Sequence, residues 1–285
     1  MPMYAVSPLR YPGAKWRLEA FVSAILADNN LTGGRYIELY AGGASLALSL
    51  LYGGHVSDIH INDLDRSIYA FWKSATEHSE DLIDLIRKTP VTMNSWRTQQ
   101  EVQKNKTHAS LLALGFSTFF LNRTNRSGIL TGGVIGGKNQ DGQWKLDARF
   151  TKSNLISRIE RVAAHRSQIH VTKMDAMYFL KRRGSTLPKK CFVYLDPPYY
   201  VKGSELYLNA YRPEDHEKLA STILSSLRRP WMVSYDDVPE IRALYGKVQS
   251  APYILRYSAS KSRKGREVVF LSPKIETRSK LLRNT

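Results

Sequence analysis

The chain has 285 residues, 42% of them hydrophobic, which suffices for one large α/β domain or for one domain with a substantial insertion. Its 42 Lys and Arg against 25 Asp and Glu give a formal net charge of +17, which points to a polyanionic partner and to nucleic acid first. No apolar run is long enough to span a membrane, and residues 1–15 lack the apolar core of a secretory signal. The single Cys191 excludes an internal disulfide, and the scattered histidines lack zinc-ligand spacing.

The first distinctive segment is Tyr11-Pro12-Gly13-Ala14-Lys15, which is rich in turn-forming residues. It precedes residues 18–26, whose apolar positions share one face of a predicted amphipathic helix. Two interpretations fit Tyr11 and Lys15: they lie in an exposed N-terminal turn, or they line a small-molecule pocket.

A strand, a turn and a helix are predicted next, at residues 36–39, 40–45 and 46–51. The small residues of the turn let a ligand approach the backbone, and the helix N-terminus favours polar or anionic ligand groups. The dinucleotide-binding pattern G-x-G-x-x-G is absent, so the turn indicates a ligand site without naming the ligand.

A second strand is predicted at residues 55–63 and ends in Asn62 and Asp63. An acid at the end of the strand after a glycine turn is where ribose hydroxyls bind in doubly wound sheets. Asp65 suits the N-cap of a helix over 67–73. We therefore assign Asp63 to a ribose and Asp65 to the cap.

Residues 74–167 differ from the rest, with several amphipathic helical stretches and a glycine-rich segment over 122–138 that is predicted to be a long loop. From residue 90 to 166, twelve Lys or Arg and four Asp or Glu give a net charge of +8. The region is either a solvated helical insertion or a subdomain whose arginine-rich loop enters a DNA duplex. We favour DNA contact, made by Asn122, Arg123, Asn125, Arg126 and Lys138.

The α/β pattern resumes with three strands and two helices, predicted at 169–175, 176–181, 191–195, 213–227 and 231–237. The first of these strands ends in Asp175. A final hairpin pairs 253–257 with 267–271 around a basic loop, 261–266, which either contacts phosphate or is a solvated turn.

The motif Asp196-Pro197-Pro198-Tyr199 follows a predicted buried strand at 191–195. Ligands bind just beyond the carboxyl ends of such strands, and the prolines hold Asp196 and the Pro197 carbonyl in a stiff geometry. These two acceptors can hold the N–H groups of an exocyclic amine while Tyr199 stacks on the ring. Drawing the amine lone pair out of conjugation makes the nitrogen a better nucleophile. The alternative is a proline-terminated strand followed by an aspartate turn.

Taken in order, these segments resemble a Dam-like DNA adenine-N6 methyltransferase in which the cofactor motifs precede the recognition domain. The matching pieces cover most of the chain: Tyr11 to Lys15, Glu38 to Ala44, Asn62-Asp63, Phe120-Leu121-Asn122-Arg123, Asp175, and Asp196 to Tyr199. Three positions depart from the family pattern, because Leu39-Tyr40 replaces the usual Pro-Phe and Ala44 replaces the last glycine.

The resemblance implies an α/β fold, with a Rossmann-like sheet of the S-adenosylmethionine-dependent methyltransferases and a mainly helical DNA-recognition insertion. A catalytic domain would span 1–73 and 168–285, and a target-recognition subdomain 74–167. S-adenosylmethionine would be the cofactor and double-stranded DNA the partner, with no membrane or metal involved. We expect a monomer in the cytoplasm of a bacterial or phage-infected cell.

The resemblance also implies residue roles. Catalysis falls to Asp196, Pro197, Pro198 and Tyr199, and cofactor contacts fall to Tyr11, Lys15, Glu38, Tyr40, Gly42, Asp63, Asp175 and Asp196. The expected reaction is methyl transfer to N6 of a flipped adenine in a short duplex sequence, of the kind found in restriction-modification systems. The alternatives are N4 of cytosine, a protein glutamine amide, which the basic insertion disfavours, and a catalytically silent DNA-binding relative.

Overall fold

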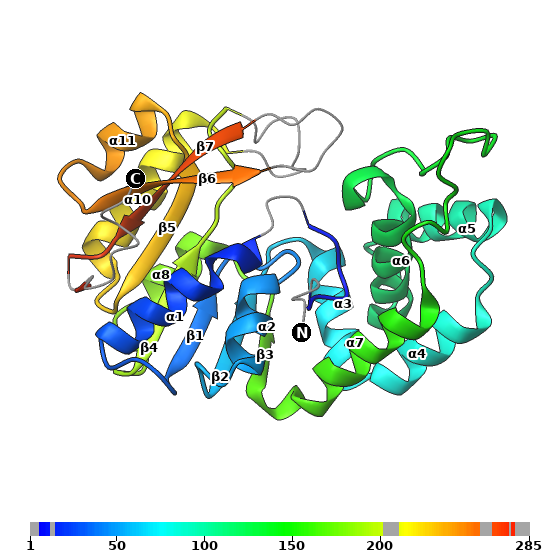
Figure 1. Cartoon of the computed structure of the whole chain (residues 1–285), viewed down its shortest axis with the longest axis horizontal. Helices are drawn as coiled ribbons and strands as arrows, with labels where there is room; N and C mark the ends of the chain where they lie inside the picture. The colour runs from blue at the N-terminus through cyan, green and yellow to red at the C-terminus, as the bar shows by residue number, and fades with distance from the viewer. Residues whose placement is uncertain (1–5, 12–14, 202–210, 257–263, 274, 277–285) are drawn as a thin grey trace. The chain divides into compact units, whose positions relative to one another are not determined.

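The computed structural model of the chain describes residues 6–11, 15–201, 211–256, 264–273 and 275–276 (Figure 1). Internal contacts divide the chain into two compact units. The helical unit comprises 1–12 and 63–173, and the sheet unit comprises 13–62 and 174–285. The domain boundaries expected from the sequence, 73/74 and 167/168, thus differ from the limits of these units, since the helical unit also takes in 63–73, 168–173 and the first segment of the chain.

The sheet unit contains six strands and the helices that connect them. Its elements are η1 (Lys15–Leu18), α1 (Glu19–Asp28), β1 (Arg35–Glu38), α2 (Ser45–Tyr52), β2 (Asp58–Asn62), α8 (Ala176–Arg183), β4 (Cys191–Leu195), α10 (Pro213–Ser226), β5 (Trp231–Asp236), α11 (Pro239–Tyr245), β6 (Ser250–Arg256) and β7 (Lys264–Leu271). The strand order is β2-β1-β4-β5-β7-β6. The first four strands are parallel, and β7 runs antiparallel to both β5 and β6.

The β4 strand forms the centre of this sheet because all five of its residues are buried between β1 and β5. Alternate residues of the strands, such as Val193 and Val233, join one hydrophobic core with side chains of α8, α10 and α11. Since side chains alternate between the two faces of a sheet, the residues between them point to the opposite face. That second face carries the polar site described below.

The helical unit is built around one strongly buried helix. Its elements are α3 (Arg66–Glu77), α4 (Ser79–Lys88), α5 (Met93–Lys104), α6 (Leu111–Thr124), η2 (Arg126–Gly128), α7 (Lys152–Ala164), η3 (Arg166–Gln168) and β3 (Ile169–Thr172). Every residue of α6 from Leu114 to Thr124 is buried, because the helix is apolar or small on all sides and packs against α3, α4 and α5. Rings from this helix, those of Phe119 and Phe120, contact Phe150.

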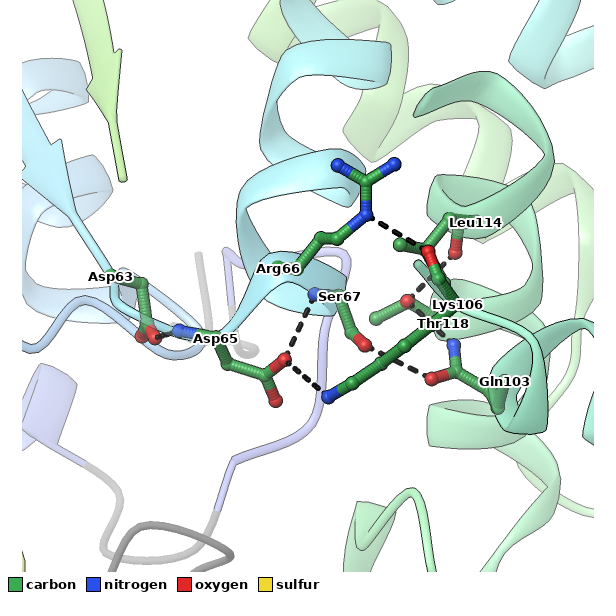
Figure 2. A network of polar contacts seen from close by, with 8 residues as sticks. All are labelled: Asp63, Asp65, Arg66, Ser67, Gln103, Lys106, Leu114 and Thr118. Carbon is green, nitrogen blue, oxygen red and sulfur yellow. Dashed lines mark hydrogen bonds and ion pairs between the residues drawn. The ribbon is translucent and has the colours of Figure 1, made fainter. Parts of the chain in front are cut away.

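A polar network fixes α3 against α5 and α6 (Figure 2). The Asp65 carboxylate accepts the backbone N–H of Ser67 at 2.9 Å, which confirms it as the N-cap of α3. The Ser67 hydroxyl bonds Gln103 at 2.9 Å, and Gln103 in turn donates to Thr118 at 2.9 Å. One chain of hydrogen bonds therefore links three helices.

The predicted strands and the hairpin are confirmed, with limits shifted by a few residues. One local prediction is wrong. The sequence predicts a loop at Asn122 and Arg123, whereas α6 continues to Thr124, because its last turn is buried and so behaves as core. Within the described part of the chain, no helix is long and apolar enough to cross a membrane. Nor do any three His, Cys, Asp or Glu side chains in that part gather as a metal site requires.

Candidate active site

Lys15 is the centre of a buried polar cluster on the second face of the sheet. Its ammonium nitrogen lies 2.9 Å from Asp196 Oδ1 and 3.0 Å from Glu267 Oε2, and it donates to the Tyr199 hydroxyl at 2.8 Å. Lys15 is 7% exposed and Glu267 is 1% exposed, so these contacts are largely shielded from solvent. One lysine therefore fixes both ends of the Asp196–Tyr199 motif.

Ser234 extends this cluster toward the interior of the sheet. Its hydroxyl donates to Asp196 Oδ1 at 2.6 Å and lies 2.7 Å from the Tyr194 hydroxyl. Tyr194, Ser234 and Glu267 share one face because their neighbours Val193, Val233 and Val268 belong to the core on the other face. The alternation of three strands thus places three polar side chains in the cluster, of which Ser234 contacts Asp196 directly.

Asp196 has one anchored oxygen and one available oxygen. Oδ1 takes both hydrogen bonds, whereas Oδ2 has no partner among the described residues, and the side chain is 17% exposed. Burial raises the pKa of Asp196, while Lys15 and the Ser234 hydrogen bond act in the opposite direction. The carboxylate is therefore fixed in orientation and retains a free acceptor.

Glu38, the last residue of β1, is a second carboxyl group of the cluster. Burial raises its pKa well above the ordinary value, and the nearby Asp196 carboxylate raises it further. The backbone N–H of Ala47 in α2 and the charge of Lys15 counter this effect only in part. Because it is 3% exposed, Glu38 is an acid held in a place that favours its neutral form.

The turn between β1 and α2 is tightly wound. Gly42 has φ of +45°, and Ala44, at the N-cap of α2, has φ of +45° and ψ of +31°. Left-handed backbone costs a residue with a Cβ atom about 1–2 kcal/mol. A glycine, which the family has at this position, would adopt this conformation without that cost, whereas Ala44 does not avoid it. The Ala44 side chain is buried, at 1% exposure.

Tyr40 and Asp175 lie beside this turn without entering the Lys15 cluster. The Tyr40 hydroxyl is 2.8 Å from the Tyr211 hydroxyl, and the Asp175 carboxylate accepts the backbone N–H of Tyr178 as the cap of α8. Burial raises the pKa of Tyr40 well above its usual value. Asn62 ties the region together, since its amide donates to the carbonyls of Leu39 and Met174.

The segment after Tyr199 is held by an acid of β5. Asp236 accepts the backbone N–H groups of Tyr200 and Val201 at 2.9 and 3.0 Å. In register, Asp236 stands opposite Glu267 of β7. The two acids divide their work, because Asp236 fixes the backbone after the motif and Glu267 fixes Lys15.

Two predicted cofactor residues belong to the helical unit. Asp63 directly follows β2, and its Oδ1 accepts the backbone N–H of Asp65 at 2.9 Å (Figure 2). Tyr11 is 40% exposed, and residues 12–14 of its motif lie outside the described residues. The roles of both residues stay predictions.

Three of the predicted DNA-contacting residues are buried. Asn122 accepts the Arg10 N–H at 2.7 Å and donates to the Arg10 and Gly128 carbonyls, and Arg123 donates to the Pro8 carbonyl. Asn125 donates to the carbonyls of residues 129 and 130 and accepts the Trp96 indole N–H. Their side chains hold backbone segments together, so a direct DNA contact stays a prediction.

The other two, Arg126 and Lys138, are exposed on the segment that follows α6. An antiparallel bridge between Asn125 and Val134 closes the first half of this segment. The Gln140 side chain closes the second half, since it donates to the Ile135 carbonyl and accepts the Leu146 N–H. Arg126 and Lys138 are thus displayed on a loop with its own internal hydrogen bonds.

The Lys15 cluster suits a cationic ligand such as S-adenosylmethionine, which carries a sulfonium and an ammonium group. Two carboxylates, those of Asp196 and Glu267, contact one lysine ammonium, and the carboxyl group of Glu38 lies within electrostatic reach of Lys15 and Asp196. Among the described atoms, Oε2 of Glu38 is buried and has no hydrogen-bond partner. The positive groups of such a cofactor would balance the excess of acids, and its ammonium could donate to the unpartnered acceptor.

Ser234, Glu267, Tyr194 and Asn62 were not assigned to the site from the sequence. Each lies on a strand that had been identified, so only the register between strands was missing. The signal available in advance was the presence of polar residues inside otherwise apolar strands, as with Glu267 before Val268.

Comparison with known proteins gives one family and several remote structures. A family model described as D12 class N6 adenine-specific DNA methyltransferase matches residues 11–258. No curated protein matches the chain. Similar solved structures include a SAM-dependent methyltransferase from Agrobacterium tumefaciens, with 10% identity, 90% of this chain and 62% of that chain covered, and a TM-score of 0.41.

Two further structures are the rRNA methyltransferase aviRa from Streptomyces viridochromogenes and TrmK from M. capricolum in complex with S-adenosylhomocysteine. The first has 11% identity, coverage of 93% and 88%, and a TM-score of 0.41. The second has 6% identity, coverage of 91% and 70%, and a TM-score of 0.39. This chain spans less than two thirds of the Agrobacterium protein. The family match, which covers most of the chain, shows that it belongs to the D12 class of N6 adenine-specific DNA methyltransferases.

Proposed function

We propose that this protein methylates N6 of an adenine in duplex DNA, with S-adenosylmethionine as the methyl donor and Asp196 as the group that orients the amine. The family supports the reaction and the cofactor. The net charge of +17 supports a polyanionic substrate, and the family supports DNA as that polyanion. The short target sequence is read by the helical unit in this proposal.

The observation that carries the proposal is the division of labour within the Asp196 carboxylate. Oδ1 is held by Lys15 and Ser234, and Oδ2 is free among the described groups. A carboxylate anchored by one oxygen cannot rotate away when the other accepts a proton donor. Such preorganised acceptors lower a reaction barrier because no reorientation is needed at the moment of reaction.

In the proposed mechanism, the target base leaves the helix stack, at a cost of a few kcal/mol, and Tyr199 stacks on it. Asp196 Oδ2 accepts one N–H of the exocyclic amine, and the Pro197 carbonyl accepts the other. These contacts pull the nitrogen lone pair out of the ring and toward the methyl donor. When bound, S-adenosylmethionine supplies an electrophilic methyl group on a sulfonium. The amine proton leaves once the nitrogen has become cationic, so no strong base is required.

Lys15 has a positioning role in this scheme. It neutralises part of the charge of Asp196 and Glu267 and binds the Tyr199 hydroxyl, so that acceptor and stacking ring keep a fixed spacing. Glu38 and the turn at Gly42 would hold the cofactor, and Asp63 would bind its ribose.

The test is Asp196→Ala beside Asp196→Asn. Asn keeps one carbonyl oxygen in the same place. We therefore expect Asp196→Ala to abolish methylation and Asp196→Asn to retain a methylation rate at least a hundredfold below that of the wild type. Mass spectrometry of the methylated nucleosides measures the product, and calorimetry shows whether S-adenosylmethionine still binds. Full turnover in the Ala variant would show that Asp196 has no part in the mechanism. If the product were N4-methylcytosine, the substrate base would be cytosine and not adenine.

A further inference from the structure

Two arginines of the helical unit, Arg123 and Arg158, converge on the first described segment of the chain, and a third, Arg10, belongs to that segment. Arg123 of α6 donates to the carbonyls of Ser7 and Pro8, and Arg158 of α7 donates to the same Ser7 carbonyl at 3.0 Å. Arg10, in that segment, donates to the Asn125 carbonyl at 3.4 Å. Two guanidinium groups that share a single carbonyl oxygen are close neighbours despite their like charge.

No carboxylate balances these charges among the described residues. Arg10, Arg123 and Arg158 make only contacts to backbone carbonyls, and α6 contains no acidic residue. The 39 residues from 102 to 140 contain no Asp or Glu at all. Around Arg158, the positions one helical turn away are Asn154, Leu155, Arg161 and Val162.

The electrostatic state of the cluster agrees with this. Burial, followed by the charges of Arg158 and Arg10, lowers the pKa of Arg123 to about 9. Burial and the charge of Arg149 lower the pKa of Arg10. Arginine is normally buried with a carboxylate or phosphate, because carbonyl contacts alone do not replace lost hydration and leave the charge uncompensated.

We propose that Arg158 binds one backbone phosphate of DNA, with the buried Arg123, which shares the Ser7 carbonyl with it, adding charge from behind and Arg10 adding to the same positive field. Arg10 and Arg158 are partly exposed, so their remaining N–H groups can reach a ligand, whereas Arg123 is 7% exposed. A phosphodiester supplies the missing negative charge and accepts paired N–H groups from guanidinium. The site rests on the proposed DNA substrate and adds an anchor that reads no sequence.

The choice of a phosphate follows from charge and position. A carboxylate from a protein partner would also neutralise arginine, but the unit that holds the cluster carries a strong excess of Lys and Arg, as a polyanion requires. The exposed Arg149 lies close enough to act on Arg10 and extends the positive field toward the loop that displays Arg126 and Lys138.

The experiment compares the wild type with Arg10→Gln/Arg158→Gln, which leaves Arg123 and the carbonyls it holds untouched. We expect DNA affinity at low salt to fall at least tenfold and the slope of log affinity against log salt to become shallower by about 1, the value for one lost phosphate contact. Non-cognate DNA should lose affinity by the same factor, because a phosphate contact carries no sequence information.

Arg166→Gln is the matched control, since it removes one positive charge from an exposed position of the same unit. It should leave the salt slope unchanged. Arg158→Lys keeps the charge and should keep most of the slope. The proposal would be overturned if the double variant had the wild-type salt slope, or if Arg166→Gln lost as much DNA affinity as the double variant.

A second measurement is independent of methylation and of DNA. Inorganic phosphate should raise the melting temperature of the wild type more than that of the double variant, with chloride at matched ionic strength as the reference. Equal stabilisation of both proteins would refute the site even if the enzyme methylates adenine. Conversely, if the protein does not methylate adenine but phosphate still stabilises the wild type more than the double variant, the phosphate site stands and the proposed reaction is wrong.

Discussion

Lys15 and the acids around it show how single residues define the chemistry of this site. A buried lysine with one acid would be a simple ion pair whose desolvation offsets its attraction. Here it contacts Asp196 and Glu267 at 2.9 and 3.0 Å and also holds Tyr199. Such an arrangement is better explained by positioning than by stability, because the lysine restricts Asp196 and Tyr199, the two side chains that face the substrate in the proposed mechanism.

Ser234 sets the protonation of Asp196 in this scheme. Its hydroxyl stabilises the charged carboxylate, so Ser234→Ala should raise the pKa of Asp196 further. Since the proposed mechanism uses the carboxylate, activity should be lost as pH falls through that pKa. We expect the acid limb of kcat/KM against pH to move upward by about one unit, which corresponds to about 1.4 kcal/mol. Ser225→Ala, at an exposed position of α10, is the control, and an acid limb identical in both variants would contradict this role.

At the residue scale, the sequence predicts the motif but not its partners. Asp196 to Tyr199 stand out because a polar, proline-rich corner ends an apolar strand. Glu267 lies 252 residues after Lys15, and nothing local connects the two. The assignment of Asn122 and Asn125 to DNA rests on the net positive charge of residues 90–166. Their burial depends on α6 being enclosed by three other helices, which a single helix pattern does not reveal.

Among the elements, the β1–α2 turn shows a conflict between local conformation and residue type. Ala44 adopts a left-handed conformation that glycine adopts without penalty, while Ala47, three residues later, is buried within the regular helix. In the described turn the conformation is set by the chain around it, and the Ala44 N–H bonds the Ala41 carbonyl at 2.6 Å.

We therefore expect Ala44→Gly and Ala47→Gly to differ. Both remove a buried methyl group, but only the first also relieves backbone strain. Ala44→Gly should stay within about 1 kcal/mol of the wild-type free energy of unfolding, whereas Ala47→Gly should lose about 1–2 kcal/mol from helix propensity and lost burial. Urea denaturation measures both. Equal losses would mean that the turn is not strained.

The elements themselves were largely predictable, since the strand at 191–195 matches β4 and the terminal hairpin is present. Their order in the sheet was not predicted, since the resemblance to a family implied only a Rossmann-like sheet. Pattern alone does not state that β7 lies between β5 and β6, and that placement is what brings Glu267 opposite Asp236.

For the molecule as a whole, buried acids affect how stability depends on pH. The pKa of Glu38 is raised in the folded state, so the unfolded chain releases this proton first as pH increases. Below about pH 4.3 the group is protonated in both states and has no effect. Above that value the folded state loses stability until pH passes the raised pKa.

Glu38→Gln removes this titration and keeps the shape of the side chain. The free energy of unfolding of the variant should exceed that of the wild type by an amount that grows with pH above about 4.3, at no more than about 1.4 kcal/mol per pH unit. Chemical denaturation at several pH values measures it, with the exposed Glu217→Gln as the control. A constant difference across pH would show that Glu38 titrates normally in the fold.

The position of β7 late in the chain determines when the active site can form during translation. Glu267, which pairs with Lys15, is added to the chain 252 residues after it. While the nascent polypeptide is still on the ribosome, the lysine and Asp196 can meet, but their acidic partner has not yet been translated. Methylating capacity should therefore arise only after β7 has been translated, and fragments that stop before residue 264 should be inert.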